Sequence, residues 1–262
     1  MSSLPPECDS SKSLIPGDRV AEFYLLGSLK WDDALRLQRR LVYESSGECG
    51  QRLHILFCEH PEMITIGRSG SRRHVRFSDE ELRRERVSVR WVSRGGGCVL
   101  HAPGQLCVYP IVSLARWGWS VGGFMCRFQE GLRRAFQQLV IRTHTYEGHF
   151  SLGGRAGVLA AMGVSVQNGI TCHGAFINVN PTMTRFANVD TLDPEHVEPG
   201  EKTTMTSLLA ERRLAVRMTS VRSALVSSLV EVFDCSRHHI HTHHPLLSDE
   251  LEDPRESIAR AS

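Results

Sequence analysis

The sequence predicts an α+β fold, a mixed β-sheet packed with helices, from two observations. Apolar residues recur at helical spacing over residues 121–140 and again over residues 218–233. Short apolar runs of strand length lie before and between these stretches, and they do not alternate with helices as a doubly wound sheet requires. Helices and strands mixed in this way are typical of the α+β class.

The first elements are expected to be a strand over residues 20–26, a helix with one broad apolar face over residues 31–43, and a buried strand over residues 53–58. Ser78 and Glu81 have the spacing of a capping box, which predicts the start of a short arginine-rich helix. The remaining elements are strands over residues 87–92, 106–112, 158–166 and 175–179 and helices over residues 121–140 and 218–233.

The length and polarity of the chain predict one domain with two tails. At 262 residues, 41% of them hydrophobic, the chain can bury the core of a single domain, which we expect over residues 18–235. Residues 1–17 are expected to form a disordered leader, and residues 236–262 a flexible tail rich in histidine.

Composition also limits the function. A formal net charge of +2 is too small to indicate nucleic-acid binding, and no apolar run is long enough to span a membrane. The eight cysteines include no Cys-x-x-Cys pair, which favours free thiols in a reducing cytoplasm. The histidines within residues 238–244 are interpreted as part of the flexible tail rather than as zinc ligands, so no metal and no cofactor are predicted.

A glycine-rich segment in the middle of the chain predicts a binding loop. Glycines let a backbone approach a ligand closely, Arg94 can pair with a carboxylate or phosphate, and His101 titrates near neutrality. The alternative is a hairpin connection that contains one structural arginine. The segment reads Arg94-Gly95-Gly96-Gly97-Cys98-Val99-Leu100-His101-Ala102-Pro103-Gly104-Gln105.

This segment is one of several ordered motifs by which residues 20–212 resemble the octanoyltransferases, the lipoyl-protein ligase B type of the lipoate and biotin ligase superfamily. The other motifs are Glu59-His60-Pro61, Thr65-Ile66-Gly67, Tyr109-Pro110-Ile111, Met162-Gly163-Val164, His173-Gly174, Asn178-Val179-Asn180 and Thr206-Ser207-Leu208.

The resemblance implies a tunnel for an eight-carbon acyl chain. Proteins of this type move an octanoyl group from acyl carrier protein to a lysine on the lipoyl domains of 2-oxoacid dehydrogenase or glycine cleavage proteins. By the resemblance, the tunnel has three walls, formed by Arg94, Gly95, Gly96, Gly97, Cys98, Val99, Leu100 and His101, by Ala161, Met162 and Gly163, and by Cys172, His173 and Gly174.

The two reactive groups that the resemblance requires are missing from this sequence. A cysteine accepts the acyl group as a thioester, and a neighbouring lysine lowers the pKa of that cysteine and handles protons. The lysine position falls on Val158, or on Ala156 when counted from Gly154-Arg155, and the cysteine position on Asp190, or on Glu198 when counted back from Thr206. The chain has only three lysines, Lys12, Lys30 and Lys202.

Three hypotheses remain for the function. In the first, Cys172 is a displaced nucleophile activated by His173. In the second, the protein is catalytically inactive and binds an octanoyl or lipoyl group, or partners a competent enzyme. In the third, Asp190, His173 and Arg155 support a new reaction, whereas the simpler interpretation of Asp190 is a turn residue.

A basic cluster near the capping box suggests two further interpretations. It can steer an acidic partner such as acyl carrier protein, or it can be a solvated face with interleaved glutamates. Its members are Arg72, Arg73, Arg76, Arg83, Arg84 and Arg86.

Overall fold

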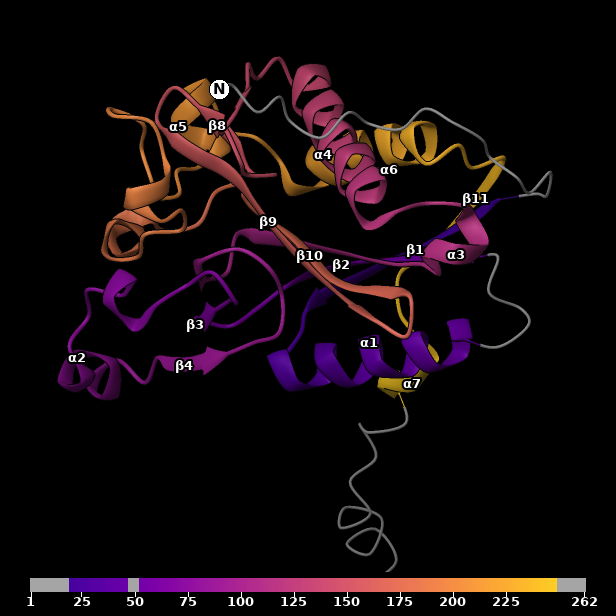
Figure 1. Cartoon of the computed structure of the whole chain (residues 1–262), viewed down its shortest axis with the longest axis horizontal. Coiled ribbons are helices and arrows are strands. Elements are labelled where there is room, and N and C mark those ends of the chain that lie inside the picture. Colours follow the sequence, from indigo (N-terminus) through magenta and orange to yellow (C-terminus); the bar gives the residue numbers. More distant parts are fainter. Residues whose placement is uncertain (1–18, 47–51, 249–262) are drawn as a thin grey trace, which may run out of the picture.

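The computed structural model describes residues 19–46 and 52–248, which form two sheets with helices on both sides (Figure 1). The main sheet has eight strands. In spatial order they are β11 (Arg237–His241), β1 (Val20–Ser28), β2 (Arg52–Glu59), β6 (Gln105–Ile111), β10 (Ile170–Asn178), β9 (Gly157–Gln167), β8 (Leu152–Gly154) and β7 (His144–Thr145).

The main sheet is mixed, which confirms the α+β prediction. Strand β1 runs parallel to both of its neighbours, β11 and β2. All the other adjacent pairs of this sheet are antiparallel. The middle strands β2, β6 and β10 are buried along almost their whole length, as their nearly continuous apolar sequences require.

Helices cover the two faces of the main sheet unequally. Figure 1 shows α4 and α6 side by side on one face, and α1 with α7 on the other. Separate apolar clusters fill the two sides, one under α4 and α6 and one under α1 and the smaller sheet. The helices are α1 (Trp31–Ser46), α2 (Asp79–Arg84), α3 (Leu114–Trp117), α4 (Val121–Gln138), α5 (Leu208–Arg212), α6 (Met218–Val232) and α7 (Pro245–Ser248), with short 3-10 turns η1 (Arg72–His74), η2 (Met183–Asn188) and η3 (Pro194–His196).

The predicted helices form close to their expected positions. Helix α4 places Phe124, Phe128 and Leu132 on its buried face, because these residues recur every four positions. The capping box of α2 is confirmed: the Glu81 N–H donates to Ser78 Oγ at 3.2 Å, and the Ser78 N–H donates to Glu81 Oε2 at 2.7 Å.

A second sheet of three strands carries the glycine-rich segment. Its order is β4 (Ser88–Trp91), β3 (Met63–Ile66) and β5 (Cys98–His101). Strand β3 is parallel to β4 and antiparallel to β5. The sequence pattern predicts the strand that leaves the glycines at residues 106–112, but the chain first forms β5 in this small sheet and only then returns to the main sheet as β6.

The structure differs from the predicted flexible tail at its beginning. Residues 237–241 form β11 at the edge of the main sheet, and α7 follows beside α1. Backbone pairing with β1 holds this strand although its side chains are mostly exposed, and His241 Nε2 lies 2.8 Å from the buried carboxylate of Glu22. The predicted leader and residues 249–262 lie outside the described residues. No helix in the described part of the chain is long and apolar enough to cross a bilayer.

Candidate functional site

A large cavity lies where the pairing of β9 with its outer neighbour, β8, ends. Strand β8 pairs with β9 only as far as Ala160, so from Ala161 onward the outer edge of β9 is unpaired by a strand. A cavity of about 900 Å³ opens beside this edge. It is lined by residues 161–166 of β9, by the glycine-rich segment, by Phe176 and by four further segments of the chain.

The glycine-rich segment closes one side of the cavity by lying directly on β9. The Gly95 N–H donates to the Val164 carbonyl at 2.9 Å. A Cβ at Gly163 would lie 2.1 Å from the Gly95 carbonyl oxygen, so neither backbone leaves room for a side chain between them. The glycines therefore permit a close backbone contact, as the sequence pattern predicts.

Arg94 holds this loop from inside the protein. Its side chain is buried, Nη1 donates to the carbonyls of Gly95 and Gly97 at 3.0 Å each, and Nη2 donates to the carbonyl and hydroxyl of Thr65. Burial lowers the pKa of the guanidinium to about 10, which leaves it charged at neutral pH. Both terminal nitrogens are used by the protein, so Arg94 fits the structural arginine of the alternative interpretation.

His101 lies behind the loop rather than in the cavity. Its Nε2 is 2.9 Å from Thr65 Oγ1, its Nδ1 is 2.9 Å from Gln105 Oε1, and burial lowers the pKa of its imidazole. Within β5, only Val99 lines the cavity. Cys98 and Leu100 lie on the opposite face because side chains alternate along a strand. The predicted first wall is thus made by Arg94, the three glycines and Val99.

The predicted second wall is present. Ala161, Met162 and Gly163 all line the cavity. Besides Phe176, the sequence patterns missed four contributors: Arg68 with Ser69, the start of α4, the loop over residues 147–151, and the segment over residues 191–196. These segments contain no recognisable motif, and only the fold brings them to β9.

The predicted third wall lies elsewhere. Strand β10 is one strand further into the sheet than β9, and Cys172 and His173 line a separate cavity of about 160 Å³ beside α1. A Cβ at Gly174 would lie 1.9 Å from the Val108 carbonyl oxygen, so this glycine packs against β6. From β10, Phe176 reaches the large cavity instead.

Cys172 and His173 do not form the pair that a displaced nucleophile needs. Cys172 Sγ lies 2.9 Å from Ser165 Oγ, its cross-strand neighbour, and burial raises the pKa of the thiol. The His173 N–H donates to Gln38 Oε1 at 2.7 Å, and its ring stacks on Trp31. Burial lowers the pKa of the imidazole to about 4. A neutral thiol in contact with a serine is a weak nucleophile.

The buried His173 imidazole is expected to make the fold sensitive to acid. The pKa of His173 is about 4 in the folded protein, whereas its ordinary value is 6.5. Between these two pH values the unfolded chain binds a proton at this histidine and the folded protein does not. The free energy of unfolding therefore falls as the pH drops from 6.5 toward 4. His54, with the same lowered pKa, contributes in the same direction. Thermal melts of the protein and of His173→Asn between pH 7.5 and 4.5 test this. The variant should lose less melting temperature, and the exposed control His243→Asn should match the parent; equal losses in all three would contradict the assignment.

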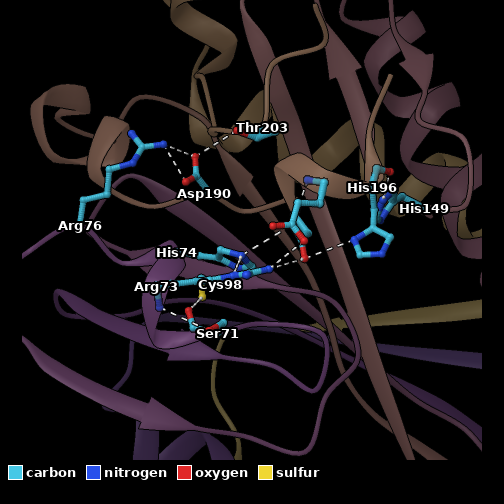
Figure 2. Close-up of polar contacts among 11 residues, drawn as sticks. Ser71, Arg73, His74, Arg76, Cys98, His149, Asp190, His196 and Thr203 are labelled. Atoms are coloured by element: carbon cyan, nitrogen blue, oxygen red, sulfur yellow. Dashed lines mark hydrogen bonds and ion pairs between the residues drawn. The ribbon is translucent and has the colours of Figure 1, made fainter. Parts of the chain in front are cut away.

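The two positions expected to hold the reactive groups are structural. Val158 is fully buried, and its backbone N–H donates to the Thr204 carbonyl. Arg76 Nη2 donates to both carboxylate oxygens of Asp190 at 2.5 and 2.7 Å, and Thr203 Oγ1 donates to Asp190 at 3.0 Å (Figure 2). Asp190 is therefore a paired anchor rather than a free base, and it does not line the cavity.

The third hypothesis required Asp190, His173 and Arg155 to meet, and the structure keeps them apart. Asp190 pairs with Arg76, and His173 lines the small cavity. Arg155 is exposed and donates to the Glu211 carbonyl.

The segment after Asp190 reaches the cavity. Thr191, Leu192, Asp193 and His196 line it. None of the described residues along the cavity wall is a cysteine or a lysine. Lys202, whose carbonyl accepts a hydrogen bond from Tyr146, is exposed and lies outside this lining.

Most of the basic cluster is neutralised within the protein. Arg72 pairs with Asp79, Arg73 with Glu195, Arg76 with Asp190 and Arg84 with Glu85. Interleaved acids of this kind support the interpretation of a solvated face over that of a free docking patch.

The fold is that of lipoate protein ligases. A lipoate-protein ligase A solved with ATP superimposes with a TM-score of 0.60, 15% identity and coverage of 92% of this chain and 93% of that one. A bipartite lipoate protein ligase from Thermoplasma acidophilum was solved in a study of that ligase and its E2 lipoyl domain. It superimposes with a TM-score of 0.61 and 14% identity, and the match covers 92% of this chain and 91% of that one. A T. acidophilum protein solved with bound lipoic acid superimposes with a TM-score of 0.66 and 14% identity, and the match covers 89% of this chain and 95% of that one. At these identities the likeness concerns the fold alone.

Sequence comparison is more specific. The lipoyl protein ligase A/B catalytic domain family matches residues 31–230. An octanoyltransferase of Roseiflexus sp. (strain RS-1) is 33% identical over 220 residues, which is 82% of this chain and 88% of that protein. An octanoyltransferase of Chloroflexus aggregans is 34% identical over 221 residues, which is 82% of this chain and 96% of that protein. The chain belongs to the octanoyltransferase family.

Proposed function

We propose that the protein binds an octanoyl or lipoyl group in the large cavity and forms no thioester with it. The observation that carries this proposal is the composition of the cavity wall, which combines apolar side chains and the glycine backbone with polar and charged side chains such as Arg68, Asp193 and His196, and includes neither cysteine nor lysine among its described residues. Its volume of about 900 Å³ lies within the range of small-molecule sites, roughly 300–1,000 Å³.

The expected partners follow from the family. We propose acyl carrier protein as the donor of the acyl group and the lipoyl domains of 2-oxoacid dehydrogenase or glycine cleavage proteins as the acceptors. The bipartite ligase of T. acidophilum, which was studied together with its E2 lipoyl domain, supports the second of these. The six described cysteines are free thiols and four of them are buried, which supports a reducing compartment such as the cytoplasm.

A thioester intermediate is disfavoured by chemistry as well as by position. A cysteine accepts an acyl group as its thiolate, and burial raises the pKa of Cys172, which also lies on the wrong strand to line the large cavity. Asp190, the other expected nucleophile position, has its carboxylate paired with Arg76.

We expect saturable binding of octanoyl acyl carrier protein with no covalent adduct. Calorimetry measures the first, and mass spectrometry before and after hydroxylamine the second. Val166→Trp, which fills the cavity from the edge of β9, should weaken binding at least tenfold, whereas Leu209→Trp, on a similarly exposed residue outside the cavity lining, should not. A hydroxylamine-labile adduct that disappears in Cys172→Ser would establish the displaced nucleophile instead, and absence of binding would overturn the proposal.

A further inference from the structure

A histidine and a carboxylate meet at the mouth of the large cavity. The carboxylate belongs to Asp193, which directly precedes η3, and the imidazole belongs to His196, the last residue of η3. Both residues line the cavity. His196 Nδ1 lies 3.3 Å from Asp193 Oδ2, three residues earlier in the chain. The side chain of His196 is 70% exposed, so the part of the cavity wall that it forms is open to solvent.

The Asp193 carboxylate is fixed by its surroundings. It caps η3, with the Glu195 N–H donating to Oδ1 at 3.0 Å. His74 Nε2 lies 3.6 Å from Oδ1, and Arg73 Nη2 lies 3.7 Å from Oδ2. The hydrogen bond from the Glu195 amide is the main cause that lowers the pKa of the carboxyl, and the neighbouring imidazoles of His74 and His196 act in the same direction. Asp193 is therefore an ionised and immobile partner for His196.

The backbone of His196 is fixed from the other side of the cavity. His149 Nε2 donates to the His196 carbonyl at 3.2 Å, which joins the loop over residues 147–151 to η3 (Figure 2). Because Nδ1 faces Asp193, Nε2 is the ring atom left to meet a ligand, and it has no partner among the residues that the structure describes. A carboxylate that orients an imidazole through Nδ1 is a general-base arrangement.

We infer that His196, oriented by Asp193, is the general base for direct transfer of the acyl group from its carrier thioester to a lysine amine. The inference rests on the proposed function, since it requires the acyl chain to lie in the cavity with its thioester at the mouth. The amine nitrogen attacks the thioester carbonyl and forms the amide C–N bond. His196 Nε2 takes the proton that the nitrogen loses, the C–S bond breaks, and the departing sulfur receives that proton. No oxidant, reductant or covalent protein intermediate enters this balance.

This mechanism explains how a member of the octanoyltransferase family can transfer an acyl group although Val158 and Asp190 occupy the positions expected for the reactive lysine and cysteine. A single displacement requires both carriers to bind at once, and the exposed position of His196 permits this. Cys172 cannot substitute for His196, because it lies on β10 and lines the other cavity.

The test uses purified full-length protein, octanoyl acyl carrier protein and an unmodified lipoyl domain, with N-octanoyllysine measured by mass spectrometry. Initial rates measured while both substrates vary should give intersecting double-reciprocal lines. His196→Gln should lower kcat by roughly 100-fold or more, the usual effect of losing a general base, while the calorimetric Kd for octanoyl acyl carrier protein stays unchanged. Asp193→Asn, which keeps an N-capping side chain, should lower kcat by a smaller factor.

The controls separate this inference from the proposed function. His239→Gln, on the exposed edge strand β11, should keep the parent rate. If octanoyl acyl carrier protein binds but no N-octanoyllysine forms, or if His196→Gln retains the parent rate, the base assignment fails and the binding function stands. Parallel double-reciprocal lines would also overturn it, because they indicate a covalent intermediate. If octanoyl acyl carrier protein does not bind at all, both fail together.

Discussion

Arg94→Met is expected to lower the melting temperature by about 6–12 °C and to abolish acyl binding. The substitution removes the guanidinium hydrogen bonds to the carbonyls of Gly95, Gly97 and Thr65, and of these the Gly97 carbonyl keeps a second donor, the Gly67 N–H. Leaving several buried acceptors unpaired costs on the order of 3 kcal/mol, and in a chain of this size each kcal/mol corresponds to roughly 2–4 °C. The glycine-rich segment then loses its support, and one wall of the cavity moves.

The matched control is Arg68→Met. Arg68 also lines the cavity, but its side chain is exposed, and no hydrogen bond or ion pair is seen for it among the described residues. Differential scanning calorimetry should show a melting temperature within about 2 °C of the parent, as for most exposed substitutions. An Arg94→Met protein as stable as Arg68→Met would contradict the structural role of Arg94.

Gly163→Ala is expected to destabilise the fold by about 1–3 kcal/mol and to weaken acyl binding by more than tenfold, because the new Cβ overpacks a rigid contact. The Cβ would lie 2.1 Å from the Gly95 carbonyl oxygen, which is backbone and cannot rotate away. The loop must lift from β9, and the hydrogen bond from Gly95 to Val164 is lost with it. Urea unfolding measures the stability, and calorimetry with octanoyl acyl carrier protein measures the binding.

Gly122→Ala serves as the comparison. A Cβ at Gly122 meets no atom within 4 Å, and the residue lies in the first turn of α4. Alanine should stabilise this helix by up to about 1 kcal/mol. If Gly163→Ala behaved in the same way, the contact between the loop and β9 would not be a close one.

Sequence patterns predicted the helices and central strands well because they depend on local spacing. Helix α4 repeats its aromatic residues at the helical period, and the capping box of α2 is complete within four residues. The glycines and Ala161, Met162 and Gly163 were predicted to line an acyl tunnel, and the structure places them on the wall of the large cavity; that the cavity holds an acyl chain stays a prediction. These are the positions at which the motif itself creates the contact.

The remaining site residues depend on register, which no local pattern shows. Cys172 and His173 stand next to a motif glycine, but β10 is separated from the cavity edge by β9. His101 belongs to a strand whose existence was not predicted, and it points into a buried network with Thr65 and Gln105. Asp193 and His196 belong to no motif and reach the cavity only because the chain from Asp190 onward passes beside it.

Strand β11 escaped prediction for a different reason. Its sequence is rich in histidine and has no apolar alternation, which favours a flexible segment. Edge strands bury little side-chain surface, and this one is defined by backbone pairing with β1 and by the contact of His241 with Glu22. Such a strand has almost no signature in its own residues.

The early end of β8 also has a consequence for solubility. A strand edge with free N–H and C=O groups is a template on which another chain can add a strand. Here the Gly95–Val164 hydrogen bond covers part of that edge, and the rest borders the cavity. The loop that shapes the ligand pocket is thus also a cover against self-association. Variants that loosen it should aggregate on warming before they unfold fully, and a bound acyl chain should delay that aggregation.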